Sequence, residues 1–371
     1  MIVGIEAERA NMPNPAGPER YAAELIRHLA KLDQKNKYVL YFRTKPLPWF
    51  YQLPPNFSIK VIPFPKFWTQ IRISWEMLWH PVDVLLILAA TLPLIHGKKS
   101  ISTIHDIAYE LFDGIYTGFM EKYQKFSSRY AAKHATKLLT VSQATKDDLV
   151  RVYYTDPNKI TVTPLGLAEG FRPMNYEEVQ PTLDKYNLTY QKYILFLGTI
   201  QPRKNIPKLV EAYEKIKKEN HIEEKLIIAG GRGWLWEPIL KKVKTSGLDG
   251  SVKYLDYIPK EDLPKLLAGA KLHTLPAQYE GFGIPALEAM ASGVPTVVSN
   301  LSSLPEVVGE AGRLVDPNSA DSIAEGLLEV LTDNNLRQQM IGKGLEQAKK
   351  FTWENCAKRT LEVIESLRSQ S

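Results

Sequence analysis

Two glutamates flank the start of a predicted helix in the segment LHTLPAQYEGFGIPALEAMASGVPTVVSN, residues 272–300. Glu280 follows a strand that ends near Leu275, and Glu288 comes eight residues later, inside the helix. Pro285 falls in the first helical turn, where proline is favoured. Free amides at a helix N-terminus attract anions. Such a site fits a sugar nucleotide, with one glutamate for ribose hydroxyls and one for sugar hydroxyls. The plainer alternative is a helix-end charge interaction plus one surface glutamate.

Two other predicted strand ends carry residues suited to phosphate, and ligands of open α/β sheets bind at such ends. In LFLGTIQPRKNI, Gly198 turns the chain and Arg203 and Lys204 precede a helix. Two adjacent cations suit a diphosphate, although a solvated basic turn would look the same. In LIIAGGRGW the glycines permit close approach of a ligand, but they equally suit a plain turn.

The segment Gly281-x-Gly283-x-x-Ala286 also matches the dinucleotide-binding pattern, and Glu306 follows about 20 residues later. This predicts, as an alternative, a nicotinamide-dependent oxidoreductase. Against it, the glycines come five residues or more after the strand instead of directly after it.

A second candidate group is the pair His105 and Asp106, which follows the predicted strand Ser100–Ile104. The pair could be an oriented base or a polar strand end with a local hydrogen bond, and the residues alone leave both open. The sequence contains no Asp-x-Asp metal pattern. We therefore expect no metal and no cofactor, with Arg203 and Lys204 stabilising the charge of a leaving diphosphate.

The elements that must position these residues are short apolar runs alternating with amphipathic stretches. Near-continuous apolar strands separated by helices predict parallel sheets covered on both faces. The predicted strands are Ile2–Ile5, Tyr38–Phe42, Ile59–Ile62, Val84–Leu88, Ser100–Ile104, Leu138–Val141, Ile160–Thr163, Tyr193–Leu197, Lys225–Ala229, Val252–Leu255, Lys271–Leu275 and Thr296–Ser299. The predicted helices are 19–32, 119–136, one capped by Ser142, 205–219, 235–246, 260–269, 283–292, 319–332, 334–350 and 353–369.

The length of 371 residues predicts about two domains. We place their boundary in the polar stretch 172–190, which gives domains 1–175 and 176–352, followed by a helix in 353–371. The single cysteine, Cys356, cannot form an internal disulfide. The longest apolar stretch has 12 residues, against about 20 for a membrane span, and the N-terminus lacks the apolar core of a secretory signal. We expect a cytoplasmic protein.

Charge is unevenly distributed, with 22 Lys and Arg against 15 Asp and Glu in residues 1–175. This is either chance or a basic half that meets an anionic partner, such as the inner face of the cell membrane or a phosphorylated acceptor. The aromatic and basic region 46–79 could lie on a membrane or bind a lipid-linked glycan. Phe67, Ile71, Trp75 and Leu78 also have helical spacing, and we favour their burial in a core.

The motifs PAGPERYAAEL, TIHDIAYE, LLTVSQATKDDL, VTPLGLAEGFRP, FLGTIQPRKNI, AGGRGW and EGFGIPALEAMASGVPTV occur in this order along nearly the whole chain. With them the chain resembles a family 4 retaining glycosyltransferase of the GT-B fold, closest to the bacterial mannosyltransferase branch. The resemblance implies two Rossmann-like doubly wound domains facing a cleft. It also implies transfer of a hexose, mannose favoured, from a nucleotide-diphosphate sugar to a glycan or lipid-linked acceptor. The implied donor is GDP-mannose in preference to UDP-sugars, and nucleic acid is not an expected partner. A non-catalytic sugar-nucleotide-binding protein is a further alternative.

The resemblance also implies roles for individual residues. Arg203 and Lys204 would bind the diphosphate, Glu288 the ribose and Glu280 the transferred sugar. His105 would lie beside that sugar in the cleft, and the last helix would cross back to the first domain. The remaining donor-binding positions are Gly17, Gly198, Ile258, Gly281, Phe282, Gly283, Ile284 and Leu287. The family often has two adjacent glycines where this chain has Ala16 and Gly17.

Overall fold

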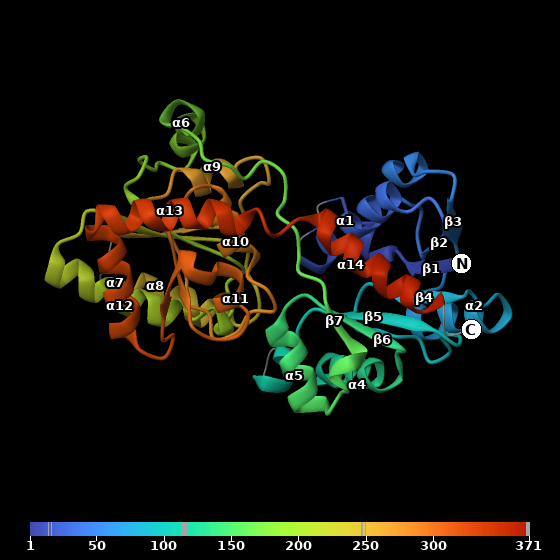
Figure 1. The fold of residues 1–371 in the computed structure, drawn as a ribbon. Helices are drawn as coiled ribbons and strands as arrows, with labels where there is room; N and C mark the ends of the chain where they lie inside the picture. Colours follow the sequence, from blue (N-terminus) through green and yellow to red (C-terminus); the bar gives the residue numbers. More distant parts are fainter. Residues whose placement is uncertain (14, 16, 113–117, 246–247, 249, 369–371) are drawn as a thin grey trace. The chain divides into compact units, whose positions relative to one another are not determined.

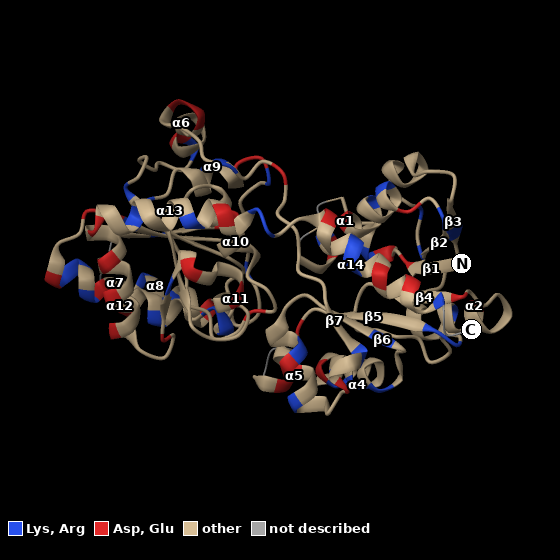
Figure 2. Ribbon diagram, in the orientation of Figure 1, with Lys and Arg blue, Asp and Glu red and all other residues tan. Residues whose placement is uncertain are grey.

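The structure is a computed structural model that describes residues 1–371 except 14, 16, 113–117, 246–247, 249 and 369–371 (Figure 1). Its contacts divide the chain into two compact units. The first comprises Met1–Gly166 and Thr352–Ser371, and the second comprises Leu167–Phe351. Figure 2 shows cations and anions interspersed on the helices of both units.

The first unit contains a parallel sheet in the order β3-β2-β1-β4-β5-β6-β7. Its strands are β1 (Ile2–Glu6), β2 (Lys37–Phe42), β3 (Phe57–Val61), β4 (Val84–Ile87), β5 (Ser100–Ile104), β6 (Lys137–Thr140) and β7 (Ile160–Val162). Its α-helices are α1 (Gly17–Leu32), α2 (Ser74–Trp79), α3 (Ala108–Leu111), α4 (Gly118–His134), α5 (Gln143–Tyr153) and α14 (Trp353–Ser366). Short helical turns are η1 (Glu8–Ala10), η2 (Pro48–Gln52), the π-helical η3 (Thr69–Ile73) and η4 (Pro157–Lys159). β4 and β5 are buried along their whole length, as expected for strands covered on both faces.

The second unit repeats the architecture with the parallel order β10-β9-β8-β11-β12-β13. Its strands are β8 (Tyr193–Leu197), β9 (Lys225–Ala229), β10 (Val252–Leu255), β11 (Leu272–Leu275), β12 (Thr296–Ser299) and β13 (Gly312–Val315). Its helices are α6 (Tyr176–Lys185), η5 (Pro202–Lys204), α7 (Ile206–Asn220), α8 (Trp236–Lys244), α9 (Leu263–Ala268), α10 (Ile284–Ala291), α11 (Leu304–Val308), η6 (Gly309–Ala311), α12 (Ala320–Thr332) and α13 (Asn334–Ala348). Two Rossmann-like α/β units confirm the predicted fold class.

The chain passes from the first unit to the second at Gly166, nine residues before the predicted boundary at 175. A Cβ on Gly166 would lie 2.2 Å from the amide nitrogen of Trp353, the first residue of α14. This close approach ties Gly166 to α14, which belongs to the first unit and packs against α1. The stretch 172–190, expected to be a polar connection, contains α6. An Asn175 capping box begins this helix, which includes Pro181.

The expectation of a buried helix face at Phe67, Ile71, Trp75 and Leu78 is wrong. All four side chains are exposed, and the segment buries Trp68, Ile73 and Met77 in the core instead. The spacing correctly indicated a helical stripe, but two apolar stripes run along this segment. Packing against β4, β5 and α4 selects the other one.

Three further expectations need comment. The N-cap at Ser142 is confirmed, because its side chain accepts a hydrogen bond from the Thr145 amide at 3.1 Å. β13 was missed because its sequence GRLV begins with glycine and arginine, which gives a weak apolar signal. Ala16 and the predicted helix ends at residues 246 and 369 lie outside the described residues. In the described part of the chain, no helix combines the length and apolarity needed to cross a bilayer.

Candidate active site

Arg203 and Lys204 are positioned by the connection between β8 and α7. The fully buried β8 ends at Leu197, and the chain then turns at Gly198 beside Gly230. A Cβ on Gly230 would lie 2.1 Å from the Gly198 carbonyl oxygen, so glycine is required at this crossing of two loops. Asn205 ends the short helix η5 and donates from its side-chain amide to the carbonyls of Pro276 at 3.1 Å and Pro317 at 2.7 Å. These bonds hold the segment of the two cations against the loops that follow β11 and β13.

Glu280 lies in the first of these loops, between β11 and α10. The Gln278 amide donates to the Arg203 carbonyl at 2.8 Å. The Ser302 and Ser303 hydroxyls donate to the Glu280 carbonyl at 2.5 Å and 2.8 Å. The backbone that carries Glu280 is therefore held from two sides. Hydrogen-bonded loops of this kind place a side chain with little freedom.

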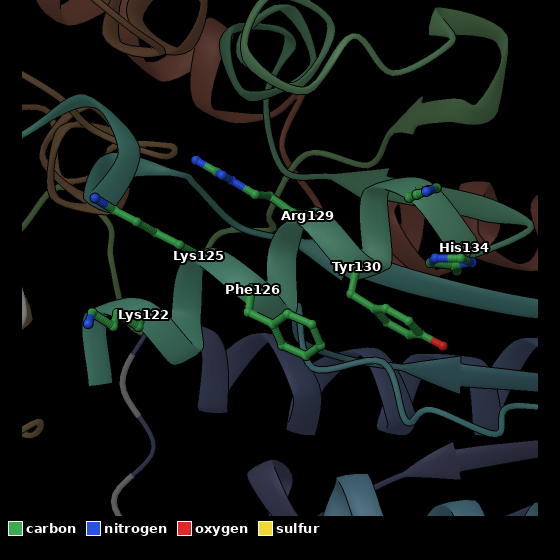
Figure 3. Close-up of a pocket in the computed structure, with 7 residues that line it drawn as sticks. Lys122, Lys125, Phe126, Arg129, Tyr130 and His134 are labelled. Carbon is green, nitrogen blue, oxygen red and sulfur yellow. The ribbon is translucent and has the colours of Figure 1, made fainter. Parts of the chain in front are cut away.

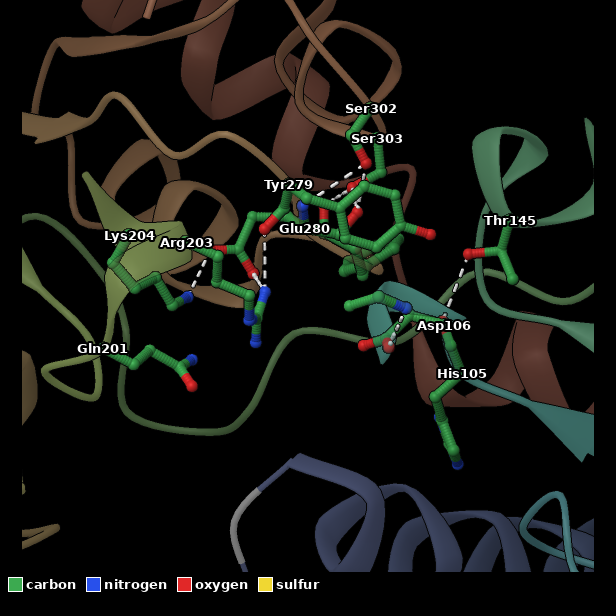
Figure 4. A network of polar contacts seen from close by, with 12 residues as sticks. His105, Asp106, Thr145, Gln201, Arg203, Lys204, Tyr279, Glu280, Ser302 and Ser303 are labelled. Atoms are coloured by element: carbon green, nitrogen blue, oxygen red, sulfur yellow. Dashed lines mark hydrogen bonds and ion pairs between the residues drawn. The ribbon is translucent and has the colours of Figure 1, made fainter. Parts of the chain in front are cut away.

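The two cations and Glu280 form one buried charged group, which Figure 4 shows with Lys204 and Arg203 directed toward the carboxylate. Lys204 Nζ contacts Glu280 Oε1 in an ion pair, and Arg203 Nη1 lies 3.3 Å from Glu280 Oε2. Arg203 also donates to the Tyr279 carbonyl at 2.7 Å. The sequence predicted all three residues but did not predict that they touch, because 76 residues separate Lys204 from Glu280.

Burial and charge act in opposite directions on Glu280, whose residue is only 6% exposed. Burial by itself raises the pKa of this carboxyl, whereas the charges of Lys204 and Arg203 lower it. The net pKa is below its ordinary value. Glu280 is therefore ionised at neutral pH. The buried group carries two positive charges against one negative charge, which suits it to an anionic ligand.

Glu288 lies on α10 and is 3% exposed. Gly283, with a φ of +104°, begins this helix. The amides of Ala286 and Leu287 both donate to the Gly283 carbonyl, at 3.0 Å and 3.3 Å. The Gly283 carbonyl therefore takes up the amides of Ala286 and Leu287, and the expected binding of the donor at Ile284 and Leu287 stays a prediction.

The remaining donor-side predictions fall in two environments. Phe282 is buried and packs edge-on against Phe351, Leu287 is fully buried, and Ile258 belongs to the core cluster beside β10. Gly17 opens α1 with a φ of +47°, and a Cβ there would meet no atom within 4 Å. Its positive φ explains the glycine, while its predicted approach to phosphate stays a prediction.

His105 occupies the corresponding edge of the first unit, directly after β5. Its Nε2–H donates to the Leu88 carbonyl at 3.2 Å, and Tyr21 packs edge-on against the ring at 4.8 Å. Burial lowers the pKa of His105 to about 4, so the ring is neutral at pH 7. Asp106 accepts a hydrogen bond from the Ala108 amide at 3.1 Å. This favours the local strand-end alternative over an Asp-oriented base.

Glu6, at the end of β1, was missed. Its register partners are Tyr41 on β2 and Ile87 on β4. Ile87 directly precedes Leu88, whose carbonyl accepts the hydrogen bond from His105. Burial raises the pKa of Glu6 to about 7 despite the opposing charge of Arg9. The sequence signal was an acid ending the apolar run IVGIE, and it had been used only to exclude a secretory signal.

The dinucleotide-binding alternative does not fit this geometry. Five residues lie between Leu275, at the end of β11, and Gly281. Glu306 lies within helix α11, not at the end of a neighbouring strand. The fingerprint requires its glycines directly after a strand. In the described residues no three His, Cys, Asp or Glu side chains are grouped to hold a metal.

Comparison with known proteins identifies the family. Residues 15–169 match the model for Glycosyltransferase Family 4, and residues 182–347 match that for Glycosyl transferases group 1. The chain is 38% identical over 270 residues to O-antigen chain mannosyltransferase B of Escherichia coli, covering 73% of this chain and 71% of that protein. The chain belongs to glycosyltransferase family 4. This glycosyltransferase is also 30% identical over 282 residues to the serotype-specific mannosyltransferase WbdA of Escherichia coli, but the match covers only 34% of WbdA.

Solved structures support the GT-B fold of this glycosyltransferase. Sucrose-phosphate synthase of Thermosynechococcus elongatus aligns with a TM-score of 0.79 at 19% identity, covering 100% of both chains. HepE of Anabaena in complex with UDP-glucose aligns with a TM-score of 0.75 at 16% identity, covering 98% of this chain and 99% of that one. These likenesses concern the fold alone.

Proposed function

We propose that this glycosyltransferase moves a mannosyl unit from a nucleotide-diphosphate sugar to a glycan acceptor, with retention of anomeric configuration and without a metal. The buried group of Lys204, Arg203 and Glu280 carries the proposal. It offers positive charge for a diphosphate and a carboxylate for sugar hydroxyls. The similarity to mannosyltransferases supports mannose as the sugar. GDP-mannose is the proposed donor in preference to UDP-sugars.

In this proposal the donor diphosphate replaces Glu280 as the partner of Lys204 and Arg203. Charge-assisted hydrogen bonds to phosphate would offset the charge that grows as the sugar C1–O bond breaks. Glu280, released from the cations, would accept hydrogen bonds from the sugar. The acceptor oxygen forms the new bond to C1, and its proton passes to the departing phosphate oxygen. Glu288 would hold the ribose, and neutral His105 would hydrogen-bond the sugar.

The test compares single substitutions of the two glutamates, because the proposal gives them different roles. Glu288→Gln should weaken the free nucleoside diphosphate and the full donor alike. Glu280→Gln should leave diphosphate affinity unchanged or stronger, since it removes the competing partner of Lys204, and should lower the single-turnover rate. Turnover also distinguishes transfer from mere donor binding. If Glu280→Gln weakens the diphosphate as much as Glu288→Gln does, these roles are wrong.

Metal independence needs its own measurement. Transfer by the wild-type protein should persist in excess chelator, because cations of the chain take the place of a metal at the diphosphate. Activity that is lost in chelator and restored by Mg²⁺ or Mn²⁺ would contradict this part of the proposal.

We further propose that the acceptor is lipid-linked and that the enzyme works in the cytoplasm, at the inner face of the cell membrane. The support is an exposed aromatic and basic surface on the first unit. Assays with the same glycan on a lipid and on a water-soluble aglycone should show a lower KM for the lipid-linked form. Equal KM values would contradict this part of the proposal.

A further inference from the structure

An apolar stripe lies exposed along η3 and α2 of the first unit. Trp75 and Trp79 are 62% and 63% exposed, and Ile71 lies one turn before Trp75. The two tryptophan rings lie 6.3 Å apart. Large apolar side chains grouped in this way mark a surface that another body covers. The core below the stripe is complete without them, since Ile73 and Met77 fill it from the other side of the same segment.

Helix α4 continues this surface with alternating aromatic and cationic side chains. Phe119, Lys122, Phe126 and Lys133 are all exposed and recur at helical spacing. Lys122, Phe126 and Lys133 also line a hollow of about 500 Å³ on α4, in which Figure 3 shows the Phe126 and Tyr130 rings on the same side of the helix. Phe126 and Tyr130 stack at 5.8 Å between ring centroids.

Ring contacts and hydrogen bonds join the two parts into one surface. The Phe67 and Phe119 rings lie 6.2 Å apart. Tyr130 donates to the Leu94 carbonyl at 3.0 Å, and the next residue, Ile95, donates from its amide to Ser74 Oγ at 3.1 Å. We name this surface the α2–α4 face and define it by Ile71, Trp75, Trp79, Phe119, Lys122 and Phe126.

Charge decides between possible occupants. The acids next to the face are already paired, Glu76 with Lys60 and Arg72, Glu110 with Arg129, and Glu121 with Lys125. These pairs set four cations against three acids, and Lys122 and Lys133 add two further positive charges. The first unit holds 24 Lys and Arg against 17 Asp and Glu, and the second 23 against 24. Exposed lysine is depleted at protein–protein interfaces, whereas tryptophan with lysine is typical of interfacial helices.

We propose that the α2–α4 face docks on the anionic surface of a lipid bilayer, with Trp75 and Trp79 entering the headgroup layer and Lys122 and Lys133 contacting lipid phosphates. This deepens the proposed function, because it names the surface through which a lipid-linked acceptor would be reached. The long lysine side chains can extend to phosphate while their methylene groups lie on the neighbouring rings.

The experiment measures co-sedimentation of the whole protein with vesicles. Vesicles of phosphatidylcholine with phosphatidylglycerol should bind the wild type, and phosphatidylcholine alone should bind it about ten-fold less, because each cation gains from an anionic surface. Trp75→Ser with Trp79→Ser, and separately Lys122→Glu with Lys133→Glu, should each weaken binding about ten-fold. Added salt should weaken the wild type but change the lysine variant little.

Matched controls test whether the exposure of an aromatic side chain, or the net charge alone, is responsible for vesicle binding. Tyr51→Ser removes an aromatic side chain that is 60% exposed in η2, whose Trp49 lies under Arg27 of α1. Lys218→Glu with Lys349→Glu changes the net charge equally in the second unit, on α7 and directly after α13. Both controls should bind vesicles as the wild type does.

The outcomes separate this inference from the proposed function. All variants should transfer mannose to a water-soluble acceptor at the wild-type rate. A wild type that transfers but does not bind vesicles overturns the bilayer proposal alone, and so does a Trp75/Trp79 variant that changes only the oligomeric state. A wild type that binds vesicles through these residues but transfers no mannose overturns the proposed function alone.

Discussion

The two units share one architecture and carry their candidate site residues at the same edge of the sheet. They differ in the charge state that burial leaves to the titratable side chains there. In the first unit, Glu6 ends β1 and His105 follows β5, and these two strands flank β4. Burial shifts both pKa values toward the neutral form, raising that of Glu6 to about 7 and lowering that of His105 to about 4. In the second unit, Glu280 stays ionised against Lys204 and Arg203. Burial penalises charge in both units.

The difference shows that burial alone does not decide the charge of a group. A cation in direct contact keeps Glu280 ionised, whereas the more distant charge of Arg9 does not offset the burial of Glu6. A neutral polar edge suits sugar hydroxyls, and a charged one suits a diphosphate. This difference supports the proposal that the second unit binds the donor diphosphate through Lys204 and Arg203.

The largest effect should come from breaking the charged group. Lys204→Ala leaves Glu280 buried with Arg203 as its remaining cation. Removing one partner of a buried pair costs about 3–5 kcal/mol of unfolding free energy. Affinity for nucleoside diphosphate should also fall by roughly 10- to 150-fold, as measured by calorimetry.

A double variant separates these two losses. Lys204→Ala with Glu280→Gln should regain most of the stability but not the affinity, because it removes the buried carboxylate that Lys204→Ala leaves with Arg203 alone, without restoring a phosphate ligand. A single Lys204→Ala variant as stable as the wild type would show that the pair does not hold the second unit together.

The stability that Glu6 contributes should change with pH in the opposite direction to that of an ordinary carboxylate, whose pKa is lowered on folding. Its raised pKa means that the folded state binds the proton more tightly between pH 4.5 and about 7. The stability it contributes is therefore present at low pH and is lost as pH rises through this window. Glu6→Gln should be more stable than the wild type by about 3 kcal/mol above pH 7 and nearly equal below pH 4.5. Identical melting curves against pH would contradict this assignment.

His105 should show a titration shifted toward acid. Because its pKa is lowered from 6.5 to about 4, the folded state binds fewer protons than the unfolded state in that interval. Its contribution to stability is therefore lost as pH falls from 6.5 toward 4. Histidine NMR signals, assigned with a His105→Asn variant, should be those of neutral imidazole until pH approaches 4. A midpoint near 6.5 would mean that the ring is solvated.

The smallest effect should come from the loop that carries Glu280. Ser303→Ala removes a hydroxyl that donates to the carbonyls of Glu280 and Phe282, both at 2.8 Å. We expect a loss of about 1 kcal/mol, because Ser302 still holds the Glu280 carbonyl. Diphosphate affinity should change little. A large loss of affinity would show that the position of Glu280 depends on this single bond.

The sequence by itself determined most of the element order and the segments that carry the site. β8, β9 and β12 lie where the apolar runs placed them, because a strand buried on both faces is largely apolar along its length. The loop of Glu280 and the helix entry after Lys204 were predicted from Gly283, Pro285 and Gly198. These residues have local conformational preferences that do not depend on distant parts of the chain.

Only the tertiary structure decided which groups meet and which face is covered. Lys204 and Glu280 come from different strand ends, so their ion pair required the register of β8 beside β11. The same holds for Glu6, whose pKa depends on burial between β2 and β4. Along residues 67–79 two apolar stripes have similar helical spacing. Helical periodicity indicates that such a stripe exists but not which of the two faces the core. Contact with the sheet and α4 buried Ile73 and Met77 and left Trp75 in solvent.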